Sequence, residues 1–205
     1  MDKEIRILAI DIESSGPKLT KNVIIAIGFC LGDEKGNTLE KKTFCFKFDS
    51  FEVFDLKCLN EFWINHLDKL NVYLKTAKEP NESILDFITE IDYLDDAYDL
   101  RIISDNPSFD ITFINYYLDK YLDRLPLNYK HNGKQYRCIY DTSSFSRGLL
   151  KMDYKNPILS DLEIINKYGL SIQAIHDHYP ENDAEYIYKL NIALINKNNF
   201  IVKIT

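Results

Sequence analysis

Runs of β-forming residues fill much of the first 48 positions, and helical patterns alternate with short strand patterns through the rest of the chain. The early runs are Ile5–Ile10, Val23–Leu31 and Thr38–Phe48, and the turn residues of Gly32–Asn37 connect the last two. Strands in this arrangement predict a meander of antiparallel neighbours. A strand-first chain that then alternates helices with strands favours an α/β layered domain with a mixed sheet.

The later elements follow from the spacing of apolar residues and from capping residues. We expect helices over Asp55–Leu70, from an Asn81 cap to Leu94, over Phe109–Leu122, over Ser143–Leu150, from the Ser160 capping box to Gly169, and over Glu181–Asn196. We expect further strands over Leu100–Ser104, Arg137–Tyr140 and Phe200–Ile204. Sheets of this class bind ligands at the carboxyl ends of their strands, so a site is sought first in the residues that follow each strand.

The length and apolar content predict one domain with a full core, because 205 residues of which 45% are hydrophobic leave little room for a second. No run of about 18 apolar residues is present, which argues against a membrane span. The charged segment Met1–Glu4 leads straight into the first strand run and does not resemble a secretion signal. We therefore expect an intracellular protein, cytoplasmic or nuclear.

Four cysteines are spread through the chain, at Cys30, Cys45, Cys58 and Cys138. They form no CxxC pair, and no histidine stands at zinc-finger spacing from them. All four lie in apolar or mixed segments, where free thiols are usually buried. We expect ordinary reduced cysteines in the core.

The charge is acidic overall but uneven along the chain. The net charge of −7 argues against a general basic coat for nucleic acid, but not against an acidic site that gathers cations. Acids dominate residues 81–123, whereas bases dominate 124–155 through Arg124, Lys130, Lys134, Arg137, Arg147, Lys151 and Lys155. The basic stretch suits either a patch that holds a polyanion or an ordinary solvated surface, and the sequence leaves both open.

Two carboxylates stand at the end of the first strand run, in Asp11-Ile12-Glu13-Ser14-Ser15-Gly16. Asp11 and Glu13 are two residues apart, so strand geometry puts both side chains on one face. Neighbouring carboxylates repel each other unless they bind a proton or a cation, and oxygen ligands suit Mg²⁺ or Mn²⁺. The Ser-Ser-Gly that follows allows a substrate to approach the backbone. Solvated acids at a strand end are the alternative interpretation.

Two further segments place acids where helices are expected to begin. Asp110 ends the string Asn106-Pro107-Ser108-Phe109-Asp110, where the helix dipole favours a carboxylate. We expect Phe109 to point into the core while Asp110 faces a cleft. His178 lies in a loop before the last helix and can swing over a site that Asp183 fixes. Taken alone, Asp110 also fits a capping acid, and a histidine before a helix is more often a surface residue.

Together and in this order, the three segments resemble the DEDDh 3′–5′ exonucleases, a family of polymerase proofreading domains and oligoribonuclease-like RNA trimmers. The matching motifs are D-x-E-[ST]-x-G from Asp11, N-x-x-F-D from Asn106 and H-x-x-x-x-D from His178. The resemblance runs from Ile7 to about Leu194. It implies a single exonuclease domain over residues 1–205, with a ribonuclease-H-like three-layer α/β/α fold and a mixed five-stranded sheet.

The resemblance also implies a chemistry. Two divalent cations, Mg²⁺ or Mn²⁺, would bind to Asp11, Glu13, Asp110 and Asp183. His178 would accept the proton of the attacking water, and the terminal nucleotide would contact Ile12, Ser14, Asn106 and Phe109. The product would be a nucleoside 5′-monophosphate, released from the 3′ end of single-stranded DNA or RNA.

Several points stay open at this stage. Asp105 stands where the family often has a histidine, and the added negative charge has no defined role. His176 is a rival histidine, although only His178 has the family spacing. Trp63 and Phe62 either stack on a base or pack in the core, and the helical stripe favours a core role for at least one of them.

The alternative function is a catalytically silent relative that binds nucleic acid or protein. The choice between DNA and RNA is also open, because contacts to a 2′-hydroxyl cannot be placed from sequence. A proofreading role would require a polymerase or another protein partner.

Overall fold

The computed structural model describes residues 3–130, 137–152, 155 and 159–197. Its centre is a mixed sheet of five strands in the order β3-β2-β1-β4-β5. The strands are β1 (Ile5–Ser14), β2 (Ile24–Gly32), β3 (Thr38–Cys45), β4 (Asp99–Ser104) and β5 (Ile139–Asp141). β1, β2 and β3 pair antiparallel, β4 runs parallel to β1, and β5 runs parallel to β4. This confirms the predicted sheet, and the strand predicted at Phe200–Ile204 lies outside the described residues.

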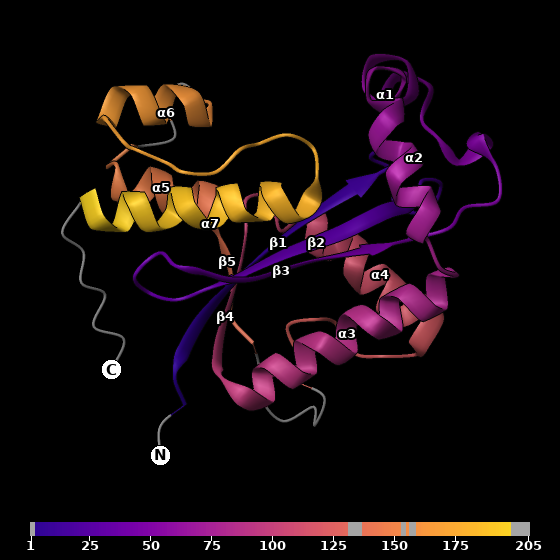
Figure 1. Ribbon diagram of the computed structural model, residues 1–205, viewed down its shortest axis with the longest axis horizontal. Coiled ribbons are helices and arrows are strands. Elements are labelled where there is room, and N and C mark those ends of the chain that lie inside the picture. Colours follow the sequence, from indigo (N-terminus) through magenta and orange to yellow (C-terminus); the bar gives the residue numbers. More distant parts are fainter. Residues whose placement is uncertain (1–2, 131–136, 153–154, 156–158, 198–205) are drawn as a thin grey trace.

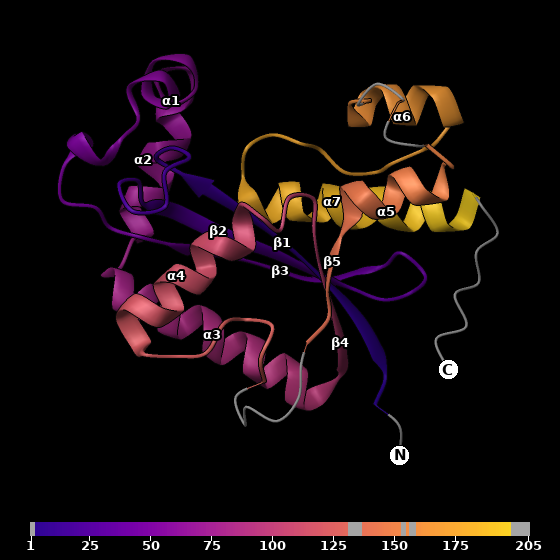
Figure 2. The ribbon, with the colours of Figure 1, turned by 180° about the vertical axis from the view of Figure 1, so that it is seen from behind.

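Helices cover both faces of the sheet, so the chain forms the predicted three-layer α/β/α arrangement (Figure 1). One face carries α3 (Pro80–Ala97) and α4 (Asp110–Leu122), and the other carries α5 (Thr142–Leu149) and α7 (Pro180–Lys197). The short helix α6 (Asp161–Tyr168) lies outside α7, and Figure 2 shows the same layers from behind. In the part of the chain that the structure describes, no helix has the length and apolar character needed to cross a bilayer.

The core forms two layers because β1 alternates its side chains between the sheet faces. Leu8, Ile10 and Ile12 point toward α3 and α4 and join the main apolar cluster. Ala9 points the other way and packs with residues of α7 such as Tyr188. Asp11 and Glu13 continue the α7 side of this alternation, and that register directs both carboxylates toward the start of α7.

The segment predicted as one helix over Asp55–Leu70 is instead broken in two, and this prediction is wrong. The chain forms α1 (Leu56–Glu61), a 3₁₀ turn (Trp63–His66) and α2 (Leu67–Thr76), with a further 3₁₀ turn at Phe51–Val53. Trp63 is 1% exposed, and its indole Nε1 donates a hydrogen bond to the Ser14 carbonyl at 2.9 Å. This tertiary contact fixes the chain against the end of β1, which a continuous helix would not allow.

Two capping predictions have opposite outcomes. Asn81 does not cap α3, because Pro80 occupies the first helical turn and Glu79 is the N-cap residue. Proline fits that position because its missing N–H has no helical partner there. The capping box of Ser160 with Glu163 is confirmed, and Gly169 ends α6 in the left-handed conformation at φ 59°.

The cysteine prediction is confirmed in part. All four cysteines are free thiols, and Cys30 and Cys45 are buried. Cys58 is half-buried. Cys138 is exposed, so its assignment to the core is wrong. It directly precedes the short edge strand β5, whose residues are themselves half-buried or exposed.

Part of the basic stretch has a structural role that neither sequence interpretation anticipated. Arg137 has a fully buried side chain, and it forms ion pairs with Asp92 and Asp95 of α3 at 2.6 and 3.4 Å. Arg124 pairs with Asp92, and Lys130 pairs with Asp95 at 3.1 Å. These three bases thus pair with acids of helix α3. Lys134 lies outside the described residues.

Candidate active site

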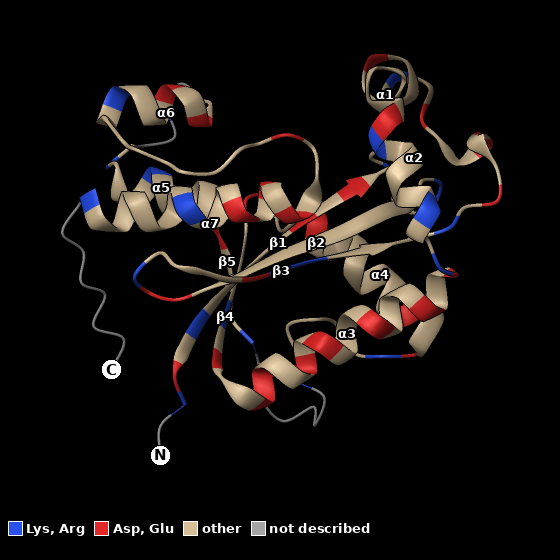
Figure 3. Ribbon diagram, in the orientation of Figure 1, with Lys and Arg blue, Asp and Glu red and all other residues tan. Residues whose placement is uncertain are grey.

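The site begins where β1 leaves its parallel neighbour. β4 pairs with β1 only as far as Ala9, whereas β2 follows β1 to Ser14. Among the described residues, no strand lies on the β4 side of the end of β1, and a side chain or substrate can approach its backbone there. Asp11 and Glu13 stand on this stretch, and Glu13 is only 8% exposed. Figure 3 shows acidic positions on β1 and in the first turns of α7.

Gly28 brings the first turn of α7 close to the sheet. It is the register partner of Asp11 on β2. A Cβ at this position would overlap the backbone of Pro180 and Glu181, so only glycine lets the two backbones meet. The contact places Asp183, one turn further along α7, beside the carboxylates of β1.

Gly28→Val is therefore expected to lower both the melting temperature of the protein and any activity of the site. Overpacking of this kind costs about 1–3 kcal/mol or more. The matched control is Gly148→Ala in α5, where an added methyl meets no atom within 4 Å. That change should be neutral or stabilising, since alanine in a helix is favoured over glycine by about 0.5–1 kcal/mol. Thermal unfolding followed by circular dichroism measures both, and equal melting temperatures for Gly28→Val and the wild type would contradict the close contact.

Asp183 is fixed by the loop that precedes its own helix. Its carboxylate accepts hydrogen bonds from the backbone N–H groups of Asp177 and His178, at 2.8 Å and 3.1 Å. The residue is 2% exposed. Carboxylate oxygens of Asp11, Glu13 and Asp183 all lie within 4.8 Å of one another. The structure thus brings together three of the four predicted metal ligands.

Asp110 stands at the start of α4, next to this group. Its Oδ2 accepts a hydrogen bond from the Ser104 hydroxyl at 2.7 Å, and the backbone N–H of Ile12 also contacts the carboxylate. It is 3% exposed. The Ile12 contact uses the open edge of β1 described above. Asp110 therefore faces the same end of β1 as the other three acids, although it lies outside their 4.8 Å group.

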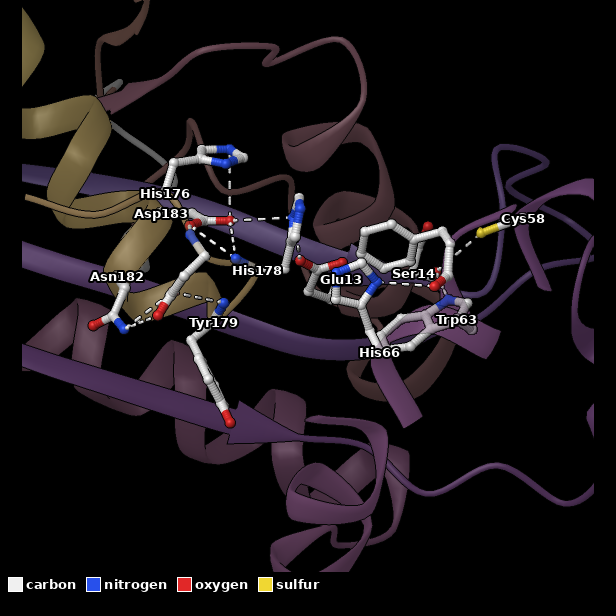
Figure 4. A network of polar contacts seen from close by, with 12 residues as sticks. Glu13, Ser14, Cys58, Trp63, His66, His176, His178, Tyr179, Asn182 and Asp183 are labelled. Atoms are coloured by element: carbon white, nitrogen blue, oxygen red, sulfur yellow. Dashed lines mark hydrogen bonds and ion pairs between the residues drawn. The ribbon is translucent and has the colours of Figure 1, made fainter. Parts of the chain in front are cut away.

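His178 faces the carboxylates from the loop before α7. Its Nδ1 lies 3.9 Å from Oε1 of Glu13 and 3.8 Å from Oδ2 of Asp183 (Figure 4). The backbone adopts a left-handed φ of 61°, and the Tyr73 hydroxyl donates a 2.6 Å hydrogen bond to the His178 carbonyl. The imidazole also contacts the Phe62 ring edge-on at 4.9 Å between centroids. The side chain is 35% exposed, so solvent can reach the ring.

The four carboxyl groups all have raised pKa values because they are buried close to one another. Burial raises the pKa of Asp11 well above its ordinary value, and the charges of Asp110 and Glu13 raise it further. Burial likewise raises the pKa of Glu13 and of Asp183. For Asp110, burial outweighs the Ser104 hydrogen bond and raises the pKa to about 7. The site thus favours either protons or cations among its carboxylates.

The chemistry of this donor set fits a divalent cation. Within the described ranges, no lysine or arginine forms an ion pair with any of the four acids. The charge of Lys69 opposes the rise in the pKa of Glu13, but its ammonium lies 3.9 Å from the Tyr179 ring centroid and forms no ion pair with Glu13 in the described part of the chain. These carboxylates have no cationic side chain as a partner and lie close enough together to bind one ion. Their oxygen atoms therefore suit Mg²⁺ or Mn²⁺.

The residues predicted to contact substrate lie around this cluster in different ways. Ile12 has its side chain in the main core, so only its backbone faces the site. The Ser14 hydroxyl bonds to the Gly16 carbonyl, and its own carbonyl is held by Trp63. Asn106 is exposed, and Phe109 packs partly against the core as expected. Their contacts with a substrate stay a prediction.

The aromatic residues above the site divide between core and cleft. Trp63 is buried among residues such as Phe54, Leu70 and Tyr73, so its ring is not accessible to a base. Phe62 is half-buried, and its ring stacks on His66 with 4.5 Å between centroids. The sequence interpretation did not identify the positioning roles of Tyr73 or Gly28. The isolated glycine in an apolar strand was a usable signal for a close backbone approach.

The fold is shared with solved structures of known nucleases. Exonuclease X in complex with 5′ overhanging duplex DNA matches 97% of this chain and 95% of its own, with a TM-score of 0.56 and 16% identity. S. pombe Pop2p in its Mg²⁺- and Mn²⁺-bound form matches 95% and 83%, with a TM-score of 0.61 and 15% identity. The fold is that of the DnaQ-like exonucleases. No protein-family model and no curated protein matches the sequence.

Exonuclease I is a further match, with a TM-score of 0.63 and 13% identity for its apo form. The match covers 95% of this chain but only 42% of exonuclease I. A complex of exonuclease I with SSB-Ct also matches, at 13% identity and a TM-score of 0.63. At these identities the comparisons establish the ribonuclease-H-like fold, and the chemistry has to be argued from the site itself.

Proposed function

We propose that this chain is a metal-dependent exonuclease that removes nucleotides from the 3′ end of single-stranded DNA or RNA. The observation that carries the proposal is the meeting of Asp11, Glu13 and Asp183 with an adjacent imidazole at the end of β1. Asp11 and Glu13 lie in β1, whereas His178 and Asp183 lie more than 160 residues further along the sequence. The likeness to DnaQ-like exonucleases supports the proposal through the fold.

The carboxylates would hold two divalent cations, Mg²⁺ or Mn²⁺. Asp11, Glu13 and Asp183 would bind one, and Asp11 together with Asp110 would bind the other. Paired cations stabilise the attacking and the leaving oxygen of an in-line phosphoryl displacement. The protein contributes a donor set held rigidly by α7, by the Ser104 hydroxyl and by the backbone of β1.

His178 is the candidate general base. Burial lowers its pKa, as do the neighbouring His176 and His66, so the imidazole is neutral at neutral pH. Its Nδ1 faces two carboxylates, which favours the ring proton on that nitrogen and leaves the Nε2 lone pair to accept a proton from water. The cleavage product would be a nucleoside 5′-monophosphate.

A degradation assay tests the proposal directly. Single-stranded DNA and RNA oligomers of matched sequence, labelled at the 5′ end, are incubated with Mg²⁺, Mn²⁺ or a chelator. We expect a ladder of products that shorten from the 3′ end, only with a metal, and lost in Asp11→Asn. The preferred polymer follows from the same gel. Binding of both oligomers without cleavage under either metal would overturn the proposal and favour a catalytically silent relative.

A further inference from the structure

His176 adds a second kind of ligand to the edge of the carboxylate cluster. Its Nε2 lies 3.6 Å from Oδ2 of Asp183, the same oxygen that faces Nδ1 of His178 at 3.8 Å. One ligand atom from each of the three residues lies within 4.8 Å of the others. Figure 4 shows the two imidazoles approaching Asp183 from different sides. The His176 side chain is 50% exposed, so an ion can enter from solvent.

The spacing of these atoms fits a small ion with nitrogen ligands. Bonds of 2.0–2.1 Å in a tetrahedral site separate neighbouring ligand atoms by about 3.3 Å. The measured separations of 3.6 and 3.8 Å exceed this by a few tenths, which small rotations of exposed rings remove. Two imidazoles with one carboxylate and an open position suit Zn²⁺ and similar transition metals, whereas Mg²⁺ prefers oxygen ligands only.

The backbone around the three side chains is already ordered for this arrangement. Asp183 Oδ1 and Oδ2 accept hydrogen bonds from the N–H groups of Asp177 and His178, and the Tyr73 hydroxyl holds the His178 carbonyl. Such hydrogen bonds to a ligand and its backbone orient the ligand and limit the ordering needed on binding. The loop therefore presents both histidines without a change of fold.

We propose that His176, His178 and Asp183 form a Zn²⁺ site whose occupation inhibits the catalytic centre. The inhibitory role rests on the proposed function, whereas the binding of Zn²⁺ does not. An ion bound to Nδ1 of His178 occupies the lone pair of that nitrogen, so the ring proton moves to Nε2. The imidazole can then no longer accept a proton from water. The same ion takes Asp183 from the carboxylates that hold Mg²⁺ or Mn²⁺.

Calorimetric titration of Zn²⁺ into the metal-free chain tests the site. We expect a tight Zn²⁺ site in the wild type beside any weaker binding by the carboxylates, and an affinity of that site lower by about 10-fold or more in His176→Gln, which removes one ligand. The matched control is His66→Ala, because His66 contacts the His178 ring at 4.9 Å much as His176 does at 5.1 Å but is not part of the ligand group. His66→Ala should bind Zn²⁺ like the wild type, and circular dichroism checks the fold of each variant.

Two further readouts separate this site from the carboxylate cluster. Co²⁺ in place of Zn²⁺ should give visible absorption bands that weaken in His176→Gln, while the Mn²⁺ affinity of that variant stays unchanged. In the nuclease assay at fixed Mg²⁺, His176→Gln should need about 10-fold more Zn²⁺ for half-inhibition. Equal Zn²⁺ affinity in His176→Gln and the wild type would overturn the proposal. Zn²⁺ binding that depends on His176 in a chain without nuclease activity would leave the site established and reject the proposed function.

Discussion

Asp11→Asn is expected to lower the nuclease rate by about 1,000-fold or more, because this carboxylate would contact both cations. The same change should raise the melting temperature of the metal-free protein. Asp11 is half-buried and is surrounded by the negative charges of Asp110, Glu13 and Asp183, so its ionised form destabilises the fold. For a domain of this size, each kcal/mol gained in the free energy of unfolding raises the melting temperature by about 2–4 °C.

The pH dependence of this effect has a defined sign. The pKa values of Asp11 and Asp110 are raised in the folded state, so the folded chain binds more protons than the unfolded chain. The metal-free protein should therefore lose stability as pH rises from about 4, the ordinary carboxyl pKa, toward the value of about 7 for Asp110. Saturating Mg²⁺ should make the free energy of unfolding depend less on pH. Asp11→Asn should reduce both this pH dependence and the stabilisation by Mg²⁺.

Asp33→Asn provides a control of opposite sign. Burial acts to raise the pKa of Asp33, but hydrogen bonds from Asn37 and Lys35 outweigh it and lower the pKa. Its charged form stabilises the turn between β2 and β3, so the amide should lower the melting temperature at neutral pH. Thermal unfolding of both variants with and without Mg²⁺ measures the contrast. A lower melting temperature for metal-free Asp11→Asn would contradict the proposed repulsion.

The strands and the acidic motifs were accessible from the sequence because their signals are local. An apolar run ending in Asp-x-Glu defines both a strand and the face of its carboxylates, and β1 follows that pattern through Glu13. The Ser160 box was likewise accessible, since its two partners are three residues apart. The order of the strands came from the family resemblance, because periodicity does not specify which strands are neighbours.

The parts that were missed depend on contacts between distant residues. The break between α1 and α2 follows from the bond of Trp63 to the carbonyl of Ser14, 49 residues away. The role of Arg137 follows from Asp92 on another element, 45 residues away. Neither partner is encoded by a local pattern, so the helical stripe was wrongly interpreted as one helix, and the buried role of Arg137 in the basic stretch was missed. The close contact at Gly28 is of the same kind, since Pro180 is remote in sequence.

His178→Gln is expected to lower the nuclease rate by about 100- to 10,000-fold, the usual contribution of a general base. Glutamine retains a polar side chain of similar reach but cannot accept and carry a proton at neutral pH. Asp11, Glu13 and Asp183 are left in place, so stabilisation of the fold by Mn²⁺ should persist. A loss of rate with metal-induced stabilisation retained separates the missing base from a damaged metal site.

The pH profile gives a second, independent test of the same role. Burial and the neighbouring His176 and His66 lower the pKa of His178. The wild-type rate should therefore fall on the acid side only below the ordinary histidine pKa of about 6.5, as the imidazole becomes protonated. His176→Gln removes one positive neighbour, so it should move this acid limb toward higher pH while the rate at neutral pH is kept. If the limb stays unchanged in His178→Gln, another group carries the proton, and the imidazole facing Glu13 and Asp183 has a different function.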